Sequence, residues 1–204
     1  MSEKKLTERE SLQIIEQMIL TAKQEQKDDG KTWIIWGWLL FFASGLTYFN
    51  IQYKWFDTFF FWNGFGIAAG LFLLYGVSRY LFFSKALKVK TYTSDLYKKL
   101  NIGFFIFLML IIVSINKGVS PVKGFALLIA LYGFWVLIYG TVLNFRPSII
   151  GAFITMGIAL CALFIEEDFQ LVMILHSTAA LVGYIIPGYI ANREFNKARL
   201  TKNT

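Results

Sequence analysis

Hydrophobic residues form long unbroken runs along this chain of 204 residues, and polar residues fall between the runs. Two neighbouring runs cover Phe125–Leu143 and Ser148–Ile165, and only Asn144-Phe145-Arg146-Pro147 separates them. Each run is close to the roughly 20 apolar residues that an α-helix needs to cross a bilayer. Pro147 suits the first turn of a helix. The pattern therefore predicts a transmembrane hairpin with a tight turn.

Four more apolar runs have the same character. Together the runs predict six membrane-spanning helices, at residues 33–50, 58–83, 101–115, 122–143, 148–165 and 169–190. The expected fold class is all-α: a six-helix transmembrane bundle over residues 32–190, followed by a basic tail over 191–204. Pro187-Gly188 predicts a kink near the end of the sixth span, since proline cannot donate a helical hydrogen bond.

Residues 1–31 have a different pattern. Thr7 and Glu10 are spaced as a capping box at a helix start, and Leu12, Ile15 and Ile19 then recur at helical spacing with Glu and Lys on the opposite face. The segment is expected to be an amphipathic helix that lies on the membrane, on a protein partner or on a second copy of the chain. We favour a protein contact through these three apolar residues, because the polar face carries both acidic and basic residues.

Composition and charge agree with a membrane protein and add an orientation. Hydrophobic residues make up 56% and charged residues 16% of the chain, and the mean hydropathy is +0.55, whereas soluble domains contain roughly 25% charged residues. Only Lys54, Lys117 and Lys123 of the 20 Lys and Arg residues fall on one side of the six-span arrangement. The positive-inside rule then places both termini in the cytoplasm and the chain in the cytoplasmic (inner) membrane. It also accounts for the net charge of +7 without a nucleic-acid partner.

His176 is the only histidine, and it lies inside the sixth span. An ionisable residue within a membrane span is a candidate functional group. A proton relay or metal site needs further ligands, and the predicted spans place no Asp, Glu or second His at the same depth. We expect a neutral imidazole bonded to a Ser, Thr or Tyr hydroxyl or to a backbone carbonyl of a neighbouring span. No catalytic set, metal site or cofactor is expected, and the sequence carries no P-loop, HExxH or GxSxG motif.

Small residues predict where spans approach one another. Gly66 and Gly70 form a GxxxG pair, and Ala179 and Gly183 form a second small pair at the same spacing. Such pairs let two helix backbones come close together in a membrane. We therefore predict helix-packing contacts at these four positions.

Several short motifs, spread over nearly the whole chain, carry a resemblance. They are Glu10-Ser11-Leu12, Trp36-Gly37-Trp38, Leu74-Tyr75-Gly76, Asn144-Phe145-Arg146-Pro147 and Gly183-Tyr184-Ile185-Ile186-Pro187-Gly188. In these the chain resembles an uncharacterised family of small polytopic integral membrane proteins of Bacteroidetes. The resemblance implies a short amphipathic N-terminal helix, several spans and a gene near a winged-helix regulator. It supplies no activity and no site residues.

These observations predict a non-enzymatic integral membrane regulator or accessory subunit. Its expected partners are the lipid bilayer and either another protein or further copies of itself, engaged through the N-terminal helix. The alternative is an oligomeric channel or transporter for a small solute. A third hypothesis is a membrane-embedded lipid-modifying enzyme with His176 as its base.

Overall fold

The computed structural model describes residues 29–83 and 92–200, and its regular elements there are all helices. In chain order they are α2 (Lys31–Tyr53), α3 (Phe60–Phe83), α4 (Tyr92–Asn116), α5 (Pro121–Val142), α6 (Arg146–Leu163), α7 (Phe169–Ala180), the π-helical turn η1 (Leu181–Ile185) and α8 (Ile186–Leu200). The predicted all-α class is thus confirmed for these residues. The predicted amphipathic helix, with Leu12, Ile15 and Ile19, lies outside them.

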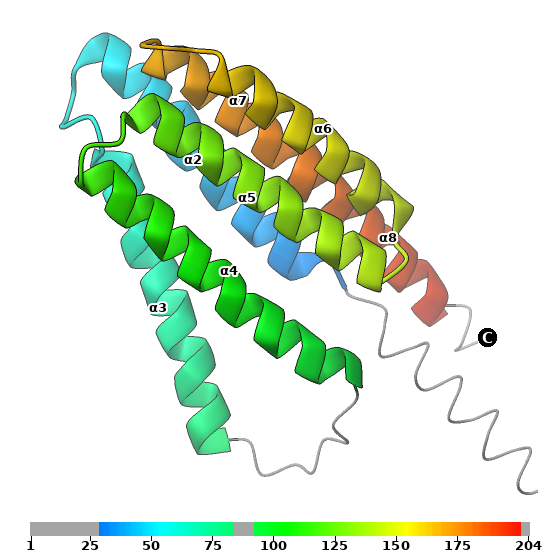
Figure 1. Cartoon of the computed structure of the whole chain (residues 1–204). Helices are drawn as coiled ribbons and strands as arrows, with labels where there is room; N and C mark the ends of the chain where they lie inside the picture. Colours follow the sequence, from blue (N-terminus) through cyan, green and yellow to red (C-terminus); the bar gives the residue numbers. More distant parts are fainter. Residues whose placement is uncertain (1–28, 84–91, 201–204) are drawn as a thin grey trace, which may run out of the picture.

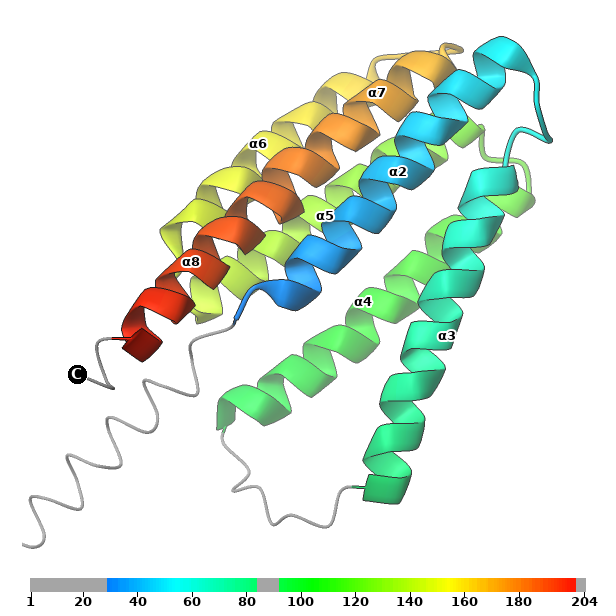
Figure 2. The same cartoon turned by 180° about the vertical axis from the view of Figure 1, so that it is seen from behind.

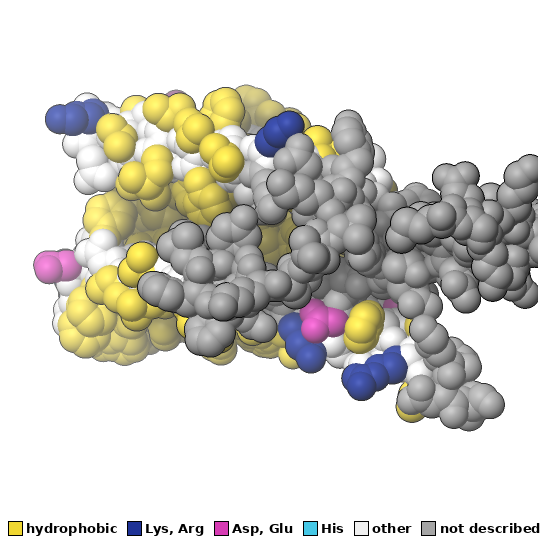
Figure 3. All heavy atoms as spheres, turned by 90° about the horizontal axis from the view of Figure 1, so that it is seen from below, with side chains coloured by type: hydrophobic (Ala, Val, Ile, Leu, Met, Phe, Trp, Pro, Cys, Tyr) yellow, Lys and Arg dark blue, Asp and Glu magenta, His cyan; other side chains and the backbone are white. Residues whose placement is uncertain are grey.

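The helices have the length and composition of membrane spans. Within the described residues, 5 helices are long and apolar enough to cross a bilayer, and α3 contributes a shorter apolar segment, Phe60–Leu71. Even the two shortest of the five, Lys99–Asn116 in α4 and the whole of α6, have 18 residues each and extend over about 27 Å at 1.5 Å per residue, close to the roughly 30 Å of a hydrocarbon core. Where the described residues are visible in Figure 3, hydrophobic side chains make up much of their surface and charged side chains are few and scattered. These features describe a multi-pass membrane protein.

Four helical rods form the body of the molecule: α2, α5, α6 and the continuous rod α7–η1–α8 (Figure 1). The tightest pairs are α5 with α6 and α2 with α7. Side chains that are completely or almost completely shielded fill the interior, among them Ile129, Val136, Val172 and Met173. The sequence-predicted hairpin is the α5–α6 pair, and Asn144 adopts a positive φ of 51° in its turn, a conformation that asparagine tolerates.

Helices α3 and α4 stand apart from this body. Figure 2 shows both of them diverging from it towards the end at which α8 finishes. Backbone contacts join α3 only to α2 and α4 only to α5 among the described helices, and none of the residues Lys99–Asn116 of α4 is buried. The described part of the chain therefore consists of a packed four-rod body and two outer helices that each make backbone contacts with one helix of it.

The connections between the helices lie at two opposite ends of the body. The loops at 54–59, 117–120 and 164–168 lie at one end, and the 143–145 turn, the start of α2 and the end of α8 lie at the other (Figure 1). The side-chain amide of Asn192 in α8 donates to the backbone oxygen of Asp29 at 2.7 Å, which ties the start of α2 to α8. The described chain thus begins and finishes at the same end of the body.

The last rod differs from the sequence expectation in two details. The basic tail predicted from residue 191 continues α8 as a regular helix to Leu200. The irregularity predicted at Pro187-Gly188 lies one turn earlier, in η1, where the backbone N–H of Ile186 bonds to the carbonyl of Leu181. The ring of Pro187 would clash with the carbonyl of Gly183 in a regular α-helix, and the wider π turn relieves that clash.

Candidate functional site

The one intramembrane histidine sits at the centre of the body. His176 is on α7, its side chain is only 1% exposed, and it is enclosed by α2, α3 and α5. Its ring nitrogen Nδ1 lies 2.8 Å from the hydroxyl oxygen of Ser44 on α2. The expectation that a hydroxyl of a neighbouring span would bind the imidazole is confirmed, and Ser44 is that partner.

The neighbouring bonds fix the direction of this contact. The Ser44 hydroxyl also lies 2.7 Å from the backbone carbonyl oxygen of Leu40, and a carbonyl can only accept. The single hydroxyl hydrogen therefore points to Leu40, and Ser44 accepts from the Nδ1–H of His176. This leaves Nε2 as an acceptor, and it has no hydrogen-bond partner among the described residues.

Aromatic rings wall in the remaining sides of the imidazole. Trp62 of α3 lies 4.9 Å away and Tyr132 of α5 lies 5.6 Å away, measured between ring centroids, and both rings stand nearly perpendicular to the imidazole. The indole N–H of Trp62 in turn donates to the sulfur of Met173 at 3.4 Å. A charged imidazolium here would be a buried charge facing aromatic rings and a hydroxyl, which is costly in a low-dielectric interior. The surroundings suit a neutral histidine that joins helices together.

His176 belongs to a polar seam between α2 and α7. We use this name for four contacts: His176 with Ser44, Ser177 Oγ with the carbonyl of Phe41 at 3.4 Å, and Gln170 Nε2 with the carbonyl of Tyr48 at 3.5 Å and with Gln52 Oε1 at 3.2 Å. Hydrogen bonds between spans stabilise a particular helix pair where apolar packing alone cannot select a partner helix. The seam explains why α7 lies against α2, its distant neighbour in sequence.

The sequence pattern contained a signal for the buried face of α2, which carries Ser44 of this seam. Ser44, Thr47 and Asn50 recur every third residue in an otherwise apolar run, and all three are buried. Asn50 closes the α2–α3 loop: its side-chain nitrogen donates to the carbonyls of Phe56 and Asp57 at 3.1 and 3.0 Å, and its side-chain oxygen accepts from the N–H of Phe56 at 2.8 Å. A one-sided polar stripe inside a span marks the face that is turned away from lipid. The spacing of the three residues identifies this face, and their residue types alone do not.

The predicted small-residue contacts divide into two groups. Ala179 is buried, and a Cβ added at Gly183 would lie 2.8 Å from the hydroxyl oxygen of Thr155 on α6, so this pair packs α7–η1 against α6. A Cβ added at Gly66 or Gly70 would meet nothing within 4 Å. The predicted packing contact at these two glycines of α3 is therefore not formed with any other described part of the chain.

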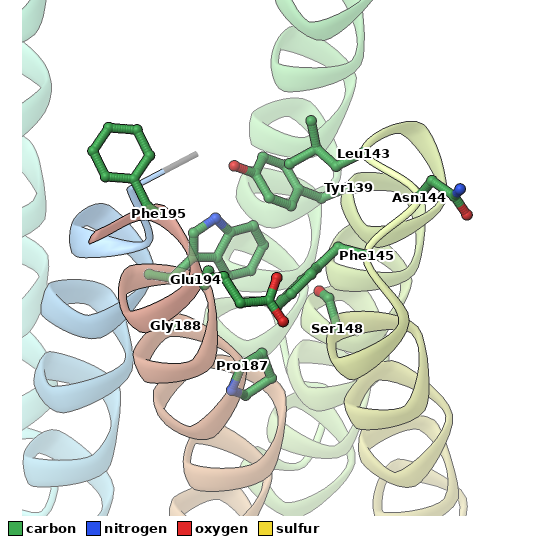
Figure 4. A pocket seen from close by; sticks show the side chains of 11 residues that line it. Tyr139, Leu143, Asn144, Phe145, Ser148, Pro187, Gly188, Glu194 and Phe195 are labelled. Carbon is green, nitrogen blue, oxygen red and sulfur yellow. The ribbon is translucent and has the colours of Figure 1, made fainter. Parts of the chain in front are cut away.

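A pocket lies where the body ends beside the α5–α6 turn, and we call it the Glu194 pocket. It has a cavity volume of about 220 Å³, and its lining includes Trp33, Tyr139, Phe145, Ser148, Glu194 and Phe195. Figure 4 shows the carboxylate of Glu194 extending from α8 towards Phe145 and Ser148. The pocket thus combines several aromatic rings with one acidic group. No local sequence pattern predicts it, because its residues come from α2, α5, α6 and α8 and from the turn between α5 and α6.

The described residues bring together no group of three or more His, Cys, Asp or Glu side chains able to hold a metal ion. Comparison with known proteins gave no match to this chain, whether among family models, curated proteins or solved structures. The resemblance noted from the sequence motifs remains a prediction.

Proposed function

We propose that this chain is an integral membrane regulator or accessory subunit without catalytic activity of its own, which holds a partner protein or a second copy of itself in the plane of the membrane. One observation carries the proposal: a tightly packed body bears two outer helices, α3 and α4, that each make backbone contacts with only one of its helices, and none of the residues Lys99–Asn116 is buried. In this arrangement the packed body provides a stable membrane domain, and the exposed surfaces of α3 and α4 are available for contact with another protein.

The surface of α3 supports assembly with a second copy. Gly66 and Gly70 lie on it with open space around them, while Ile67, Leu71 and Leu74 are each more than 60% exposed. Small residues that repeat every fourth position allow a helix of the same kind to approach closely. The N-terminal segment with Leu12, Ile15 and Ile19 would add a contact on the cytoplasmic side.

The orientation and span count belong to the same proposal. We take α3 as a full span, which gives six, and place both termini in the cytoplasm because the sparsely basic loops at 54–59, 117–120 and 164–168 gather at the opposite end. Tags at the two termini should both be shielded from an impermeant reagent in intact cells. Labelling of either tag from outside would contradict the orientation.

The other hypotheses receive less support. The body is filled along its length by buried side chains such as Ile129 and Met173, so a solute pathway would have to run between copies. His176 is enclosed by α2, α3 and α5, and a lipid substrate would reach it only after one of these helices moved away. We therefore keep the regulator or accessory role as the conclusion.

The test is co-purification of two differently tagged copies and of any associated protein in mild detergent. Replacing Leu12, Ile15 and Ile19 with Asp should abolish capture, because three carboxylates on the apolar stripe cannot be buried in a contact. Replacing Gln13, Gln17 and Gln24 with Asp adds the same charge to the opposite face of the expected helix, and capture should persist. Equal capture by the two triple variants would refute a role for the apolar stripe.

A further inference from the structure

The Glu194 pocket has the features of a binding site for an organic ammonium group. The rings of Trp33, Tyr139 and Phe145 line it together with the carboxylate of Glu194. Cations are attracted to the faces of aromatic rings, and a carboxylate adds a charge-assisted hydrogen bond or ion pair. A pocket lined by aromatic rings and one carboxylate is suited to an ammonium group rather than to an anion.

The acidic group is available for such a ligand. Glu194 makes no hydrogen bond or ion pair with another described residue, and the one salt bridge found among these residues joins Lys31 to Asp29. None of the residues that line the pocket is Lys or Arg. A carboxylate that lies beside aromatic rings and has no ion-pair partner among the described residues is electrostatically complementary to a positive group.

The position of the pocket indicates where the ammonium group comes from. Trp33 lies two residues after Lys31 at the start of a span, and Asn144 of the α5–α6 turn also lines the cavity, so the pocket lies at the level where apolar spans give way to polar segments. Its volume of about 220 Å³ is below the roughly 300–1,000 Å³ of sites for drug-sized molecules. The pocket is therefore of a size for a small group, such as the ammonium of a headgroup. Arg146, which is exposed and directly follows the lining residue Phe145, is available for a phosphate.

We propose that the Glu194 pocket binds the ammonium group of a zwitterionic phospholipid headgroup, with Glu194 and the surrounding aromatic rings contacting the nitrogen. This goes beyond the proposed accessory function and does not depend on it. The same recognition chemistry would apply to a free amine, so the test must separate the two sources.

The experiment measures binding to the full-length protein in detergent by calorimetry. The probes are short-chain phosphatidylethanolamine, phosphatidylcholine and phosphatidylglycerol, together with free ethanolamine and choline. At least one ammonium lipid should bind about tenfold or more tightly than phosphatidylglycerol. Glu194→Gln should weaken that binding by about tenfold, Glu194→Asp should restore part of it, and Glu167→Gln, a change to an exposed acid at the opposite end, should leave it unchanged.

Two results would overturn the proposal: Glu194→Gln binding the ammonium lipids as the unaltered protein does, or phosphatidylglycerol binding equally well. If free ethanolamine or choline binds as tightly as the matching lipid, the ammonium site stands and the lipid is refuted as its source. Retention of the unaltered unfolding profile by Glu194→Gln shows that a loss of binding is not a loss of folding.

Discussion

Replacing Ser44 with Ala tests whether the polar seam stabilises the fold through His176. The substitution removes the hydroxyl that, among the described residues, accepts from the Nδ1–H of the enclosed His176 side chain. A buried donor left without a partner costs roughly 1–3 kcal/mol, and hydrogen bonds between membrane helices have been worth at most about 1.7 kcal/mol. We therefore expect a loss of about 1.5 kcal/mol, or roughly a tenfold fall in the ratio of folded to unfolded protein.

The same reasoning predicts that the loss depends on the histidine. In a His176→Leu background no donor is stranded, and the Ser44 hydroxyl bonds only to the carbonyl of its own helix. Ser44→Ala should then cost no more than about 0.5 kcal/mol, so the two changes together should destabilise less than the sum of the single changes. The Leu replacement itself removes both Nδ1–H and the unpartnered Nε2.

The assay is reversible unfolding in mixed detergent micelles, followed by tryptophan fluorescence with separate baselines for each variant. Ser114→Ala is the matched control, because the Ser114 hydroxyl makes the same bond to the carbonyl four residues earlier, at 2.8 Å, on the exposed surface of α4. Equal destabilisation by the Ser44 and Ser114 changes, or an equal cost of Ser44→Ala with and without His176, would refute the argument.

Two further predictions concern packing and the α2–α3 loop, and the same unfolding assay checks both. Gly37→Ala should destabilise the protein by about 1–3 kcal/mol through overpacking, because the added Cβ would lie 2.7 Å from Ile185 Cγ1. Gly157→Ala is the control and should be neutral or slightly stabilising, since nothing lies within 4 Å of a Cβ at that position. Equal effects of the two changes on stability would contradict the packing of Gly37. Asn50→Ala should destabilise the protein by about 1–3 kcal/mol, because the backbone carbonyl and N–H of Phe56 in the loop lose their hydrogen-bond partner. Asn63→Ala changes an exposed residue and should alter stability by less than about 0.5 kcal/mol. A loss of similar size in both variants would contradict the role of Asn50 in the loop.

Apolar runs predicted the helices well, because in a membrane chain their length directly reflects bilayer thickness. The predicted turn at 144–147 corresponds to the interval between α5 and α6. The continuation of α8 to Leu200 was not predicted, since hydropathy detects only the part of a helix that crosses lipid. Charged segments such as Arg193–Leu200 form helix equally well in water.

Which helices lie together was much harder to predict. The spans are apolar around most of their circumference, so hydrophobicity does not mark a buried face. Small residues were only a partial guide: Gly183 packs against Thr155, while Gly66 faces open space. The partner of His176 was predicted by type, and its identity as Ser44 depended on a pairing across 132 positions that no local pattern encodes.

The divergence of α3 and α4 from the body has a consequence for the surrounding bilayer. The described helices spread wider at the end where α8 finishes than at the end where the three loops gather (Figures 1 and 2). If all of them cross the bilayer as proposed, the protein occupies unequal areas in the two leaflets. Folding these two helices inward would reduce that inequality. Membrane curvature and the position of α3 and α4 are therefore thermodynamically linked: a change in either shifts the equilibrium of the other.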